Sequence, residues 1–184
     1  MRAMIASPQA FRRGSFRLPP LREAVARLFE PRLVIRRSLS IDASPEAVWE
    51  ALIDLPRWPE RDRYIRWIRP LGEPPPPDGR WWAVGRRYRE QVRRGPFLPV
   101  FKLTVVQVEE GRRVAWRARY LWVDATHAWE VEPSNGGAIL SSEESFSGPR
   151  GIMAIARIVF RLFDVERMTD RQLEAMAGDV VNGD

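Results

Sequence analysis

The stretch SPEAVWEALIDLPRWPE, residues 44–60, contains a complete short helix together with its start and stop signals. Ser44 is a favourable N-cap, and Pro45 takes the first helical position, where the N–H that proline lacks is not needed. Pro56 ends the helix, and Trp58 anchors a second short turn. Between these signals the apolar residues recur at helical spacing: Val48, Trp49, Leu52 and Ile53. The sequence therefore predicts two short helices in succession.

Strand-like sequence lies on both sides of these helices. Before them, residues 33–41 largely alternate between apolar and polar side chains, which predicts a half-buried strand. The proline-rich EPPPPDG at 73–79 is predicted to be a loop, because strand patterns resume after it. The later segments, separated by turn-forming sequence, are YIRWIRPL, GRRYREQV, PVFKLTVVQV, RRVAWRARY, VDATHAWEVE and AILSSEESF. We expect an antiparallel meander.

Both ends of the chain show helical periodicity. Residues 20–30 form a short amphipathic pattern with Leu21, Val25, Leu28 and Phe29 on one face. From about Gly151 to Met176 we expect one long helix packed on the sheet, with a stripe of Ile152, Ile155, Val159, Leu162, Phe163 and Leu173. The chain is accordingly divided into an N-terminal extension (1–31), one domain (32–178) and a tail (179–184).

Strand alternation predicts an inner, apolar face of the sheet that also carries polar groups. It places Glu144 of the last strand on that face, and His127 of the strand before it. A buried carboxylate or imidazole needs a hydrogen-bonding partner, from the protein or from a ligand. The candidate ligand-binding residues on this face and on the terminal helix are Trp116, Tyr120, His127, Trp129, Ser142, Glu144, Val159 and Phe163.

The two polar candidates each have two interpretations. His127 is either a histidine satisfied within the protein, which we favour, or a ligand contact or general base. Glu144 either pairs with an arginine or with His127, or it orients a ligand. We reject a Ser142–His127–Glu144 triad, because nothing around Ser142 resembles a nucleophile elbow or an oxyanion hole. No catalytic residue is predicted.

Composition removes several classes of function. The chain has no cysteine and one histidine, which excludes disulfides, thiolate nucleophiles and multi-histidine metal clusters, so we expect neither a metal nor another cofactor. The net charge is +6, but basic and acidic residues are intermixed, so no specific nucleic-acid partner is expected. No apolar run is long enough for a transmembrane segment, and no secretory signal is apparent, so a cytoplasmic location is expected.

The order of these elements resembles the START-like helix-grip superfamily, also called SRPBCC. In particular it is similar to the polyketide cyclase/dehydrase and lipid transport branch. The resemblance covers about residues 33–177, and the segments that carry it are IDASPEAVWEALIDLPRWPE (41–60), EEGRRVAW (109–116), HAWEVEPSNGGAILSSEESFSG (127–148) and the terminal helix.

This resemblance implies an α+β fold of the helix-grip, Bet v 1-like kind. A curved antiparallel sheet of about seven strands would wrap around a long C-terminal helix, with two short helices after the first strand. The resemblance also implies a cavity between sheet and helix that accepts lipids, sterols, polyketides or other apolar molecules.

Three functions remain open from the sequence. The first is a carrier or sensor that holds a small hydrophobic molecule in the internal cavity. The second is an enzyme of the polyketide cyclase/dehydratase type, which requires His127, Glu144 and Tyr120 to converge on one pocket. The third is a structural or interaction module whose cavity is filled by tryptophan and whose N-terminal helix mediates assembly. A homodimer is compatible with each of them.

Overall fold

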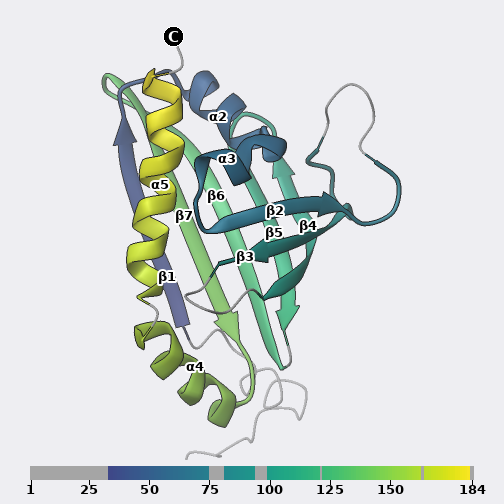
Figure 1. Cartoon of the computed structure of the whole chain (residues 1–184). Helices are drawn as coiled ribbons and strands as arrows, with labels where there is room; N and C mark the ends of the chain where they lie inside the picture. The colour runs from purple at the N-terminus through teal and green to yellow at the C-terminus, as the bar shows by residue number, and fades with distance from the viewer. Residues whose placement is uncertain (1–32, 75–80, 94–98, 121, 163, 183–184) are drawn as a thin grey trace, which may run out of the picture.

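In the computed structural model of the chain (Figure 1), the described residues are 33–74, 81–93, 99–120, 122–162 and 164–182. The helix predicted at 20–30 and residue Phe163 lie outside the described residues. The described part combines one antiparallel sheet with helices on its concave side. The predicted α+β helix-grip architecture is confirmed.

The described residues form a seven-stranded sheet in the order β1-β7-β6-β5-β4-β3-β2. All neighbouring strands are antiparallel; β2 to β7 follow one another as a meander, and β1 pairs with β7 at the far edge. The strands are β1 (Leu33–Ile41), β2 (Ile65–Pro70), β3 (Arg87–Val92), β4 (Val100–Glu109), β5 (Arg113–Tyr120), β6 (Val123–Ser134) and β7 (Gly137–Ser147).

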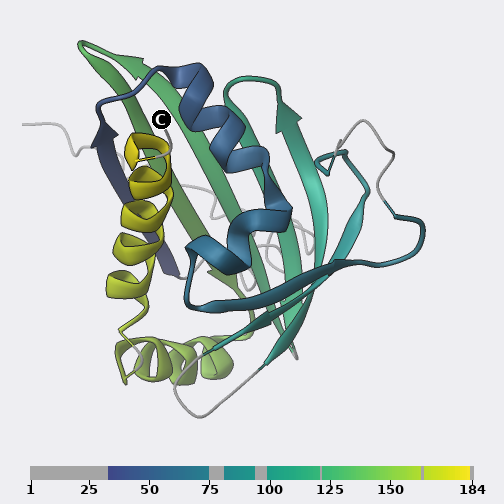
Figure 2. The same cartoon turned by 45° about the horizontal axis from the view of Figure 1, so that its top comes forward.

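The sheet curls strongly, so that β2 and β3 cross in front of the central strands (Figures 1 and 2). The strand register shifts between Ile65 and Trp67 in β2 and between Val105 and Gln107 in β4. Such bulges bend a strand and increase its local twist. The curl gives the sheet a concave inner face, which the helices cover in part.

Residues 44–60 form the predicted helices. Helix α2 (Pro45–Ile53) begins as expected, because the Ala47 N–H donates to Ser44 Oγ at 3.2 Å. A short 3-10 turn, η1 (Leu55–Arg57), and helix α3 (Trp58–Arg61) follow. Figure 2 shows α2 and α3 above the concave face, at one end of the sheet.

The prediction of a single helix from Gly151 to Met176 is wrong. The structure has two helices, α4 (Arg150–Leu162) and α5 (Val165–Asn182), and between them Asp164 has φ 46°. This left-handed backbone conformation cannot continue a right-handed helix. Helix α5 alone lies along β1 and β7 and also contacts α2, whereas α4 lies at the other end of β1. The helix that the sheet grips is therefore α5.

Asp62 connects α3 to α5. Its side chain is 2% exposed; Oδ1 accepts the Tyr64 N–H at 2.8 Å, and Oδ2 accepts from Gln172 Nε2 at 2.7 Å. Burial raises the pKa of the Asp62 carboxyl above its ordinary value of 3.8, although both hydrogen bonds and Arg63 act in the opposite direction. The folded state therefore favours protonation of this carboxyl more than the unfolded chain does.

This shift predicts a pH-dependent effect of Asp62→Asn. A raised pKa contributes stability that is fully present below the unfolded-state pKa and is lost as the pH rises through the folded-state pKa. The free energy of unfolding of Asp62→Asn, relative to the wild type, should therefore increase between pH about 3.5 and pH about 7. Urea denaturation at the two pH values measures it; a constant or falling difference would contradict this account of Asp62.

Candidate functional site

One end of the inner face is closed by aromatic rings. The Trp58 ring from α3 lies 5.9, 5.5 and 5.8 Å, centroid to centroid, from the rings of Trp82, Trp116 and Trp129. The indole N–H groups of Trp58 and Trp82 donate to the carbonyls of Leu52 and Ile53 at 3.0 and 3.1 Å. These bonds fix both rings to the end of α2. The rings fill most of the space between α3 and the sheet.

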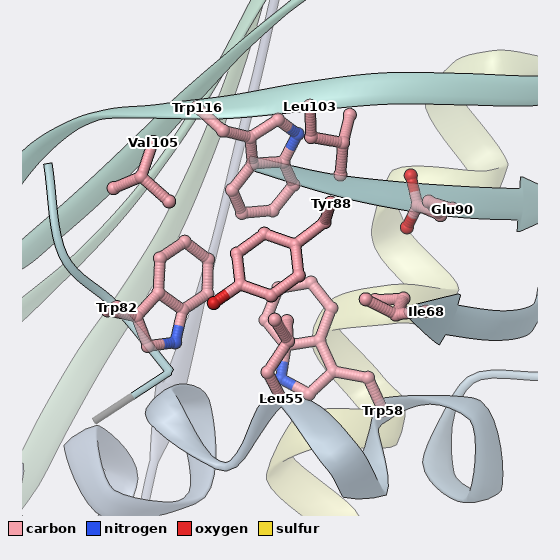
Figure 3. Close-up of a pocket in the computed structure, with 9 residues that line it drawn as sticks. All are labelled: Leu55, Trp58, Ile68, Trp82, Tyr88, Glu90, Leu103, Val105 and Trp116. Carbon is pink, nitrogen blue, oxygen red and sulfur yellow. The ribbon is translucent and has the colours of Figure 1, made fainter. Parts of the chain in front are cut away.

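A small cavity remains among these rings (Figure 3). Its free volume is about 10 Å³, which is about enough for one water molecule. Its single acidic residue, Glu90 of β3, is 8% exposed. The lining residues are Leu55, Trp58, Ile68, Trp82, Tyr88, Glu90, Leu103, Val105 and Trp116. Without movement of these side chains, this end has no room for an organic ligand.

The other end of the inner face is incompletely covered. Ala118 lies opposite Ala125, and Ala125 lies opposite Phe146, so two small side chains adjoin one another on neighbouring strands. Both alanines are half-buried, whereas Val114 and Leu140, on the same face at the α3 end, are 0% exposed. We call Ala118, Ala125, His127 and Glu144, all half-buried, the open end of the inner face.

His127 lies where the closed and open ends meet. Its ring is held between those of Trp116 and Trp129, with centroid distances of 4.6 and 4.9 Å. Its Nε2 is 2.8 Å from the Oγ of Ser142, which is 0% exposed. The histidine is thus held by stacking and by a hydrogen bond within the protein.

Glu144 lies directly opposite His127 across the β6–β7 pair. The Thr169 hydroxyl from α5 is 3.5 Å from Glu144 Oε1, but it is closer, at 3.1 Å, to the Val165 carbonyl. One hydroxyl hydrogen serves the nearer acceptor better. Glu144 therefore keeps acceptor capacity at the open end, beside His127.

The structure distributes the predicted site residues over several places. His127 and Glu144 are at the open end, and Tyr120, 50% exposed, is at its margin with its ring 5.5 Å from that of Phe101. Trp116, Trp129 and Ser142 are buried beneath or beside His127. Val159 is on α4 and 38% exposed, and Phe163 is outside the described residues. The structure thus brings the predicted residues of β5, β6 and β7 together, and Val159 is not on the helix that the sheet grips.

Sequence reasoning missed three kinds of residue near this site. Glu90 shares an alternating face with Tyr88 and Val92, so strand parity contained a usable signal for it. Trp82 lies just after the proline-rich loop, in sequence without periodicity. Ala118 and Ala125 were not among the predicted site residues. Alanine has no polar or aromatic group that would indicate a site, although a small side chain can leave room on a face of the sheet.

The outer face of the sheet carries charged side chains that form ion pairs with one another. Arg117 and Arg119 both bind Asp124, and Arg113 binds Glu130 at 2.8 Å. The hydrogen bond from Arg119 is the main cause of a lowered pKa of Asp124.

Among the described residues no group of His, Asp and Glu side chains is arranged to hold a metal ion. In the same part of the chain, no helix is long and apolar enough to cross a membrane.

The fold and the two-part inner face define a helix-grip protein. The sequence matches the family model described as polyketide cyclase / dehydrase and lipid transport over residues 32–180. This span covers most of the chain, and the protein belongs to this family. The family description includes both enzymes and carriers, so it fits a small-molecule binding protein and a cyclase equally.

Solved structures share the fold at low sequence identity. The Zhui aromatase/cyclase from Streptomyces sp. R1128 is 16% identical with a TM-score of 0.65, covering 80% of this chain and 93% of that one. Norcoclaurine synthase from Thalictrum flavum, solved with dopamine and hydroxybenzaldehyde, is 15% identical with a TM-score of 0.64, covering 100% and 99%. Ara h 8.0201 is 11% identical with a TM-score of 0.59, covering 81% and 97%. No curated protein matches the sequence.

Proposed function

We propose that the protein binds a small, mainly apolar molecule at the open end of the inner face and acts as its carrier or sensor. The observation that carries the proposal is the change in burial along β5, β6 and β7. The same face is completely buried under α3 and only half-buried at Ala118, Ala125, His127 and Glu144. Apolar surface left half-covered on a concave face is where a ligand gains most by displacing water.

The residues of the open end indicate what the ligand would offer. Ala118 and Ala125 present a low apolar floor, which suits a flat hydrocarbon or aromatic body. Each 100 Å² of apolar surface that it buries is worth about 2.5 kcal/mol before the costs of binding. Glu144 would accept a hydrogen bond from a hydroxyl or amine on one side of the ligand. A ligand with an apolar body and one polar donor fits this arrangement best.

A cyclase-type enzyme is the second candidate, because it would use the same residues. His127 and Glu144 are opposite one another and half-buried, which places a potential base beside a carboxylate. However, the His127 ring is held between two tryptophans, and its Nε2 is already within hydrogen-bond distance of Ser142. These contacts support a positioning role for His127 more than proton transfer to a substrate.

The third hypothesis, a cavity filled by tryptophan, describes the α3 end alone. There the free volume is about 10 Å³, and rings occupy the space. The alanines at the other end pair with Leu103 of β4 and Phe146 of β7, yet both remain half-buried, so no tryptophan of the described residues closes this end. A filled core at one end and a binding surface at the other are compatible in one protein.

The carrier and enzyme hypotheses differ in what happens to a bound molecule. We expect the small molecule extracted from wild-type protein to keep its mass after incubation with fresh wild-type protein. The same molecule should bind His127→Ala with less than about a tenfold change in affinity, because His127 contacts mainly protein groups. Mass spectrometry of the extract before and after incubation measures turnover, and equilibrium dialysis measures binding.

Conversion of the molecule by the wild type, lost in His127→Ala while binding persists, would establish the enzyme instead. Thr126→Ala is the matched control, because Thr126 is the neighbouring residue on the outer side of the same strand. It should leave both readouts unchanged in either case.

A further inference from the structure

Helix α4 exposes a continuous apolar stripe. Ile155, Ile158, Val159 and Leu162 are spaced i, i+3, i+4 and i+7, and they are 60%, 61%, 38% and 76% exposed. These positions form one row along a helix surface. Single exposed aliphatic residues are ordinary, but a row of four on one helix indicates a covered surface.

This stripe is separate from the face by which α4 is attached to the sheet. Met153, 2% exposed, and Phe160 pack against Phe146 and Ile35, and the Phe160 and Phe146 ring centroids are 4.6 Å apart. The attached face therefore already has its partners. The exposed row needs a second partner.

The chain enters the described structure beside α4. Leu33, the first residue of β1, lies opposite Phe146 and packs in the same cluster as Ala156 and Phe160 of α4. Figure 1 shows this end of β1 next to α4. Pro31 and Arg32 separate Leu33 from the pattern at 20–30, a reach of roughly 10 Å. Whatever precedes β1 must start within reach of the stripe.

The segment 20–30 matches the stripe in length and apolar pattern. As a helix its 11 residues would span roughly 16 Å, and the 13 residues of α4 span roughly 20 Å. Charge does not decide the pairing, because α4 contains three arginines and no acidic residue, whereas the segment contains two arginines and two glutamates. Its own apolar row consists of Leu21, Val25, Leu28 and Phe29.

We propose that residues 20–30 form a helix that packs on the exposed stripe of α4 within the same chain. Two apolar rows would then cover one another. The extension is in this view a part of the domain rather than an assembly module. The inference does not depend on the proposed ligand site.

The absence of cysteine from the chain allows a clean cross-linking test. The double variant Val25→Cys/Ile158→Cys places one thiol in the middle of each row, so it serves for either relative direction of the two helices. The control Val25→Cys/Ala47→Cys places the second thiol on an exposed position of α2, at the opposite end of the domain from α4. Under mild oxidation we expect a disulfide within the monomer for the first pair, formed at least tenfold faster than in the control.

Equal rates for the two pairs would overturn the proposal. Disulfides that form between chains for the first pair would instead assign the stripe to a second copy of the protein. Loss of the cross-link on addition of vesicles of phosphatidylglycerol and phosphatidylcholine would assign it to a lipid surface. Both outcomes contradict a helix of the same chain as the occupant.

Hydrogen exchange gives a second test that needs no cysteine. Removal of residues 1–30 should speed amide exchange in α4 at least tenfold and leave α5 unchanged, because only α4 would lose its cover. Equal exchange of α4 in the full and shortened chains would overturn the proposal.

Discussion

Replacement of Ala125 by phenylalanine should lower the affinity for an apolar fluorescent probe, 1-anilinonaphthalene-8-sulfonate, at least tenfold. Ala125 lies between Ala118 and Phe146 on the inner face, and its small side chain is half-buried. A ring at this position would occupy the space that the ligand body needs. A tenfold loss corresponds to about 1.4 kcal/mol, less than the apolar contact of one aromatic ring supplies. Fluorescence titration measures the affinity.

Ala47→Phe is the matched control, because it adds the same ring at an exposed position of α2. It should bind the probe as the wild type does. Ala125→Phe should retain the wild-type unfolding midpoint within a few degrees, because the ring enters a half-buried space rather than a filled core. Equal probe affinity of the two variants would mean that the open end is not the binding surface.

Replacement of Trp58 by alanine should destabilise the protein by about 3–5 kcal/mol. The Trp58 side chain is 2% exposed, contacts three other tryptophan rings and donates a hydrogen bond to Leu52 O. Its removal leaves a large hole in a core that holds only about 10 Å³ of free volume. Denaturant unfolding followed by circular dichroism measures the loss.

Trp122→Ala makes the same chemical change at a position that is 65% exposed. Its effect on the free energy of unfolding should stay within about 0.5 kcal/mol. A cost below about 1 kcal/mol for Trp58→Ala would show that the rings around it are loosely packed and that the α3 end is not closed.

Local chemistry explains which parts of the fold the sequence predicts well. Ser44 and Pro45 act on the backbone within one turn, so the start of α2 follows from adjacent residues. The faces of β6 and β7 follow from parity, which depends only on position within the strand. Both kinds of signal can be read from the sequence without knowledge of the tertiary structure.

The break between α4 and α5 was not predicted from the sequence. It depends on the backbone conformation of one residue, Asp164, and the apolar spacing on its two sides continues almost unchanged. The Asp164 side chain also accepts from the Arg167 N–H at 3.4 Å, in the manner of an N-cap. An aspartate inside an apolar pattern was the only signal of a new helix start.

The candidate site could be predicted in composition but not in shape. Alternation places His127 and Glu144 on the inner face, and the structure places them there. Whether a given part of that face is closed or open depends on where α3 and α5 lie over it and on how far β2 and β3 curl across it (Figure 2). These placements depend on contacts between residues far apart in the sequence, so the alternation within a single strand does not predict them.

Native mass spectrometry of the protein purified from its own host tests the central claim most directly, with Ala125→Phe purified in parallel. The account predicts that the wild type carries an additional small-molecule mass, released on denaturation, and that Ala125→Phe carries much less of it. The same additional mass on both proteins would contradict a ligand at the open end. So would the absence of any additional mass together with no binding of the fluorescent probe.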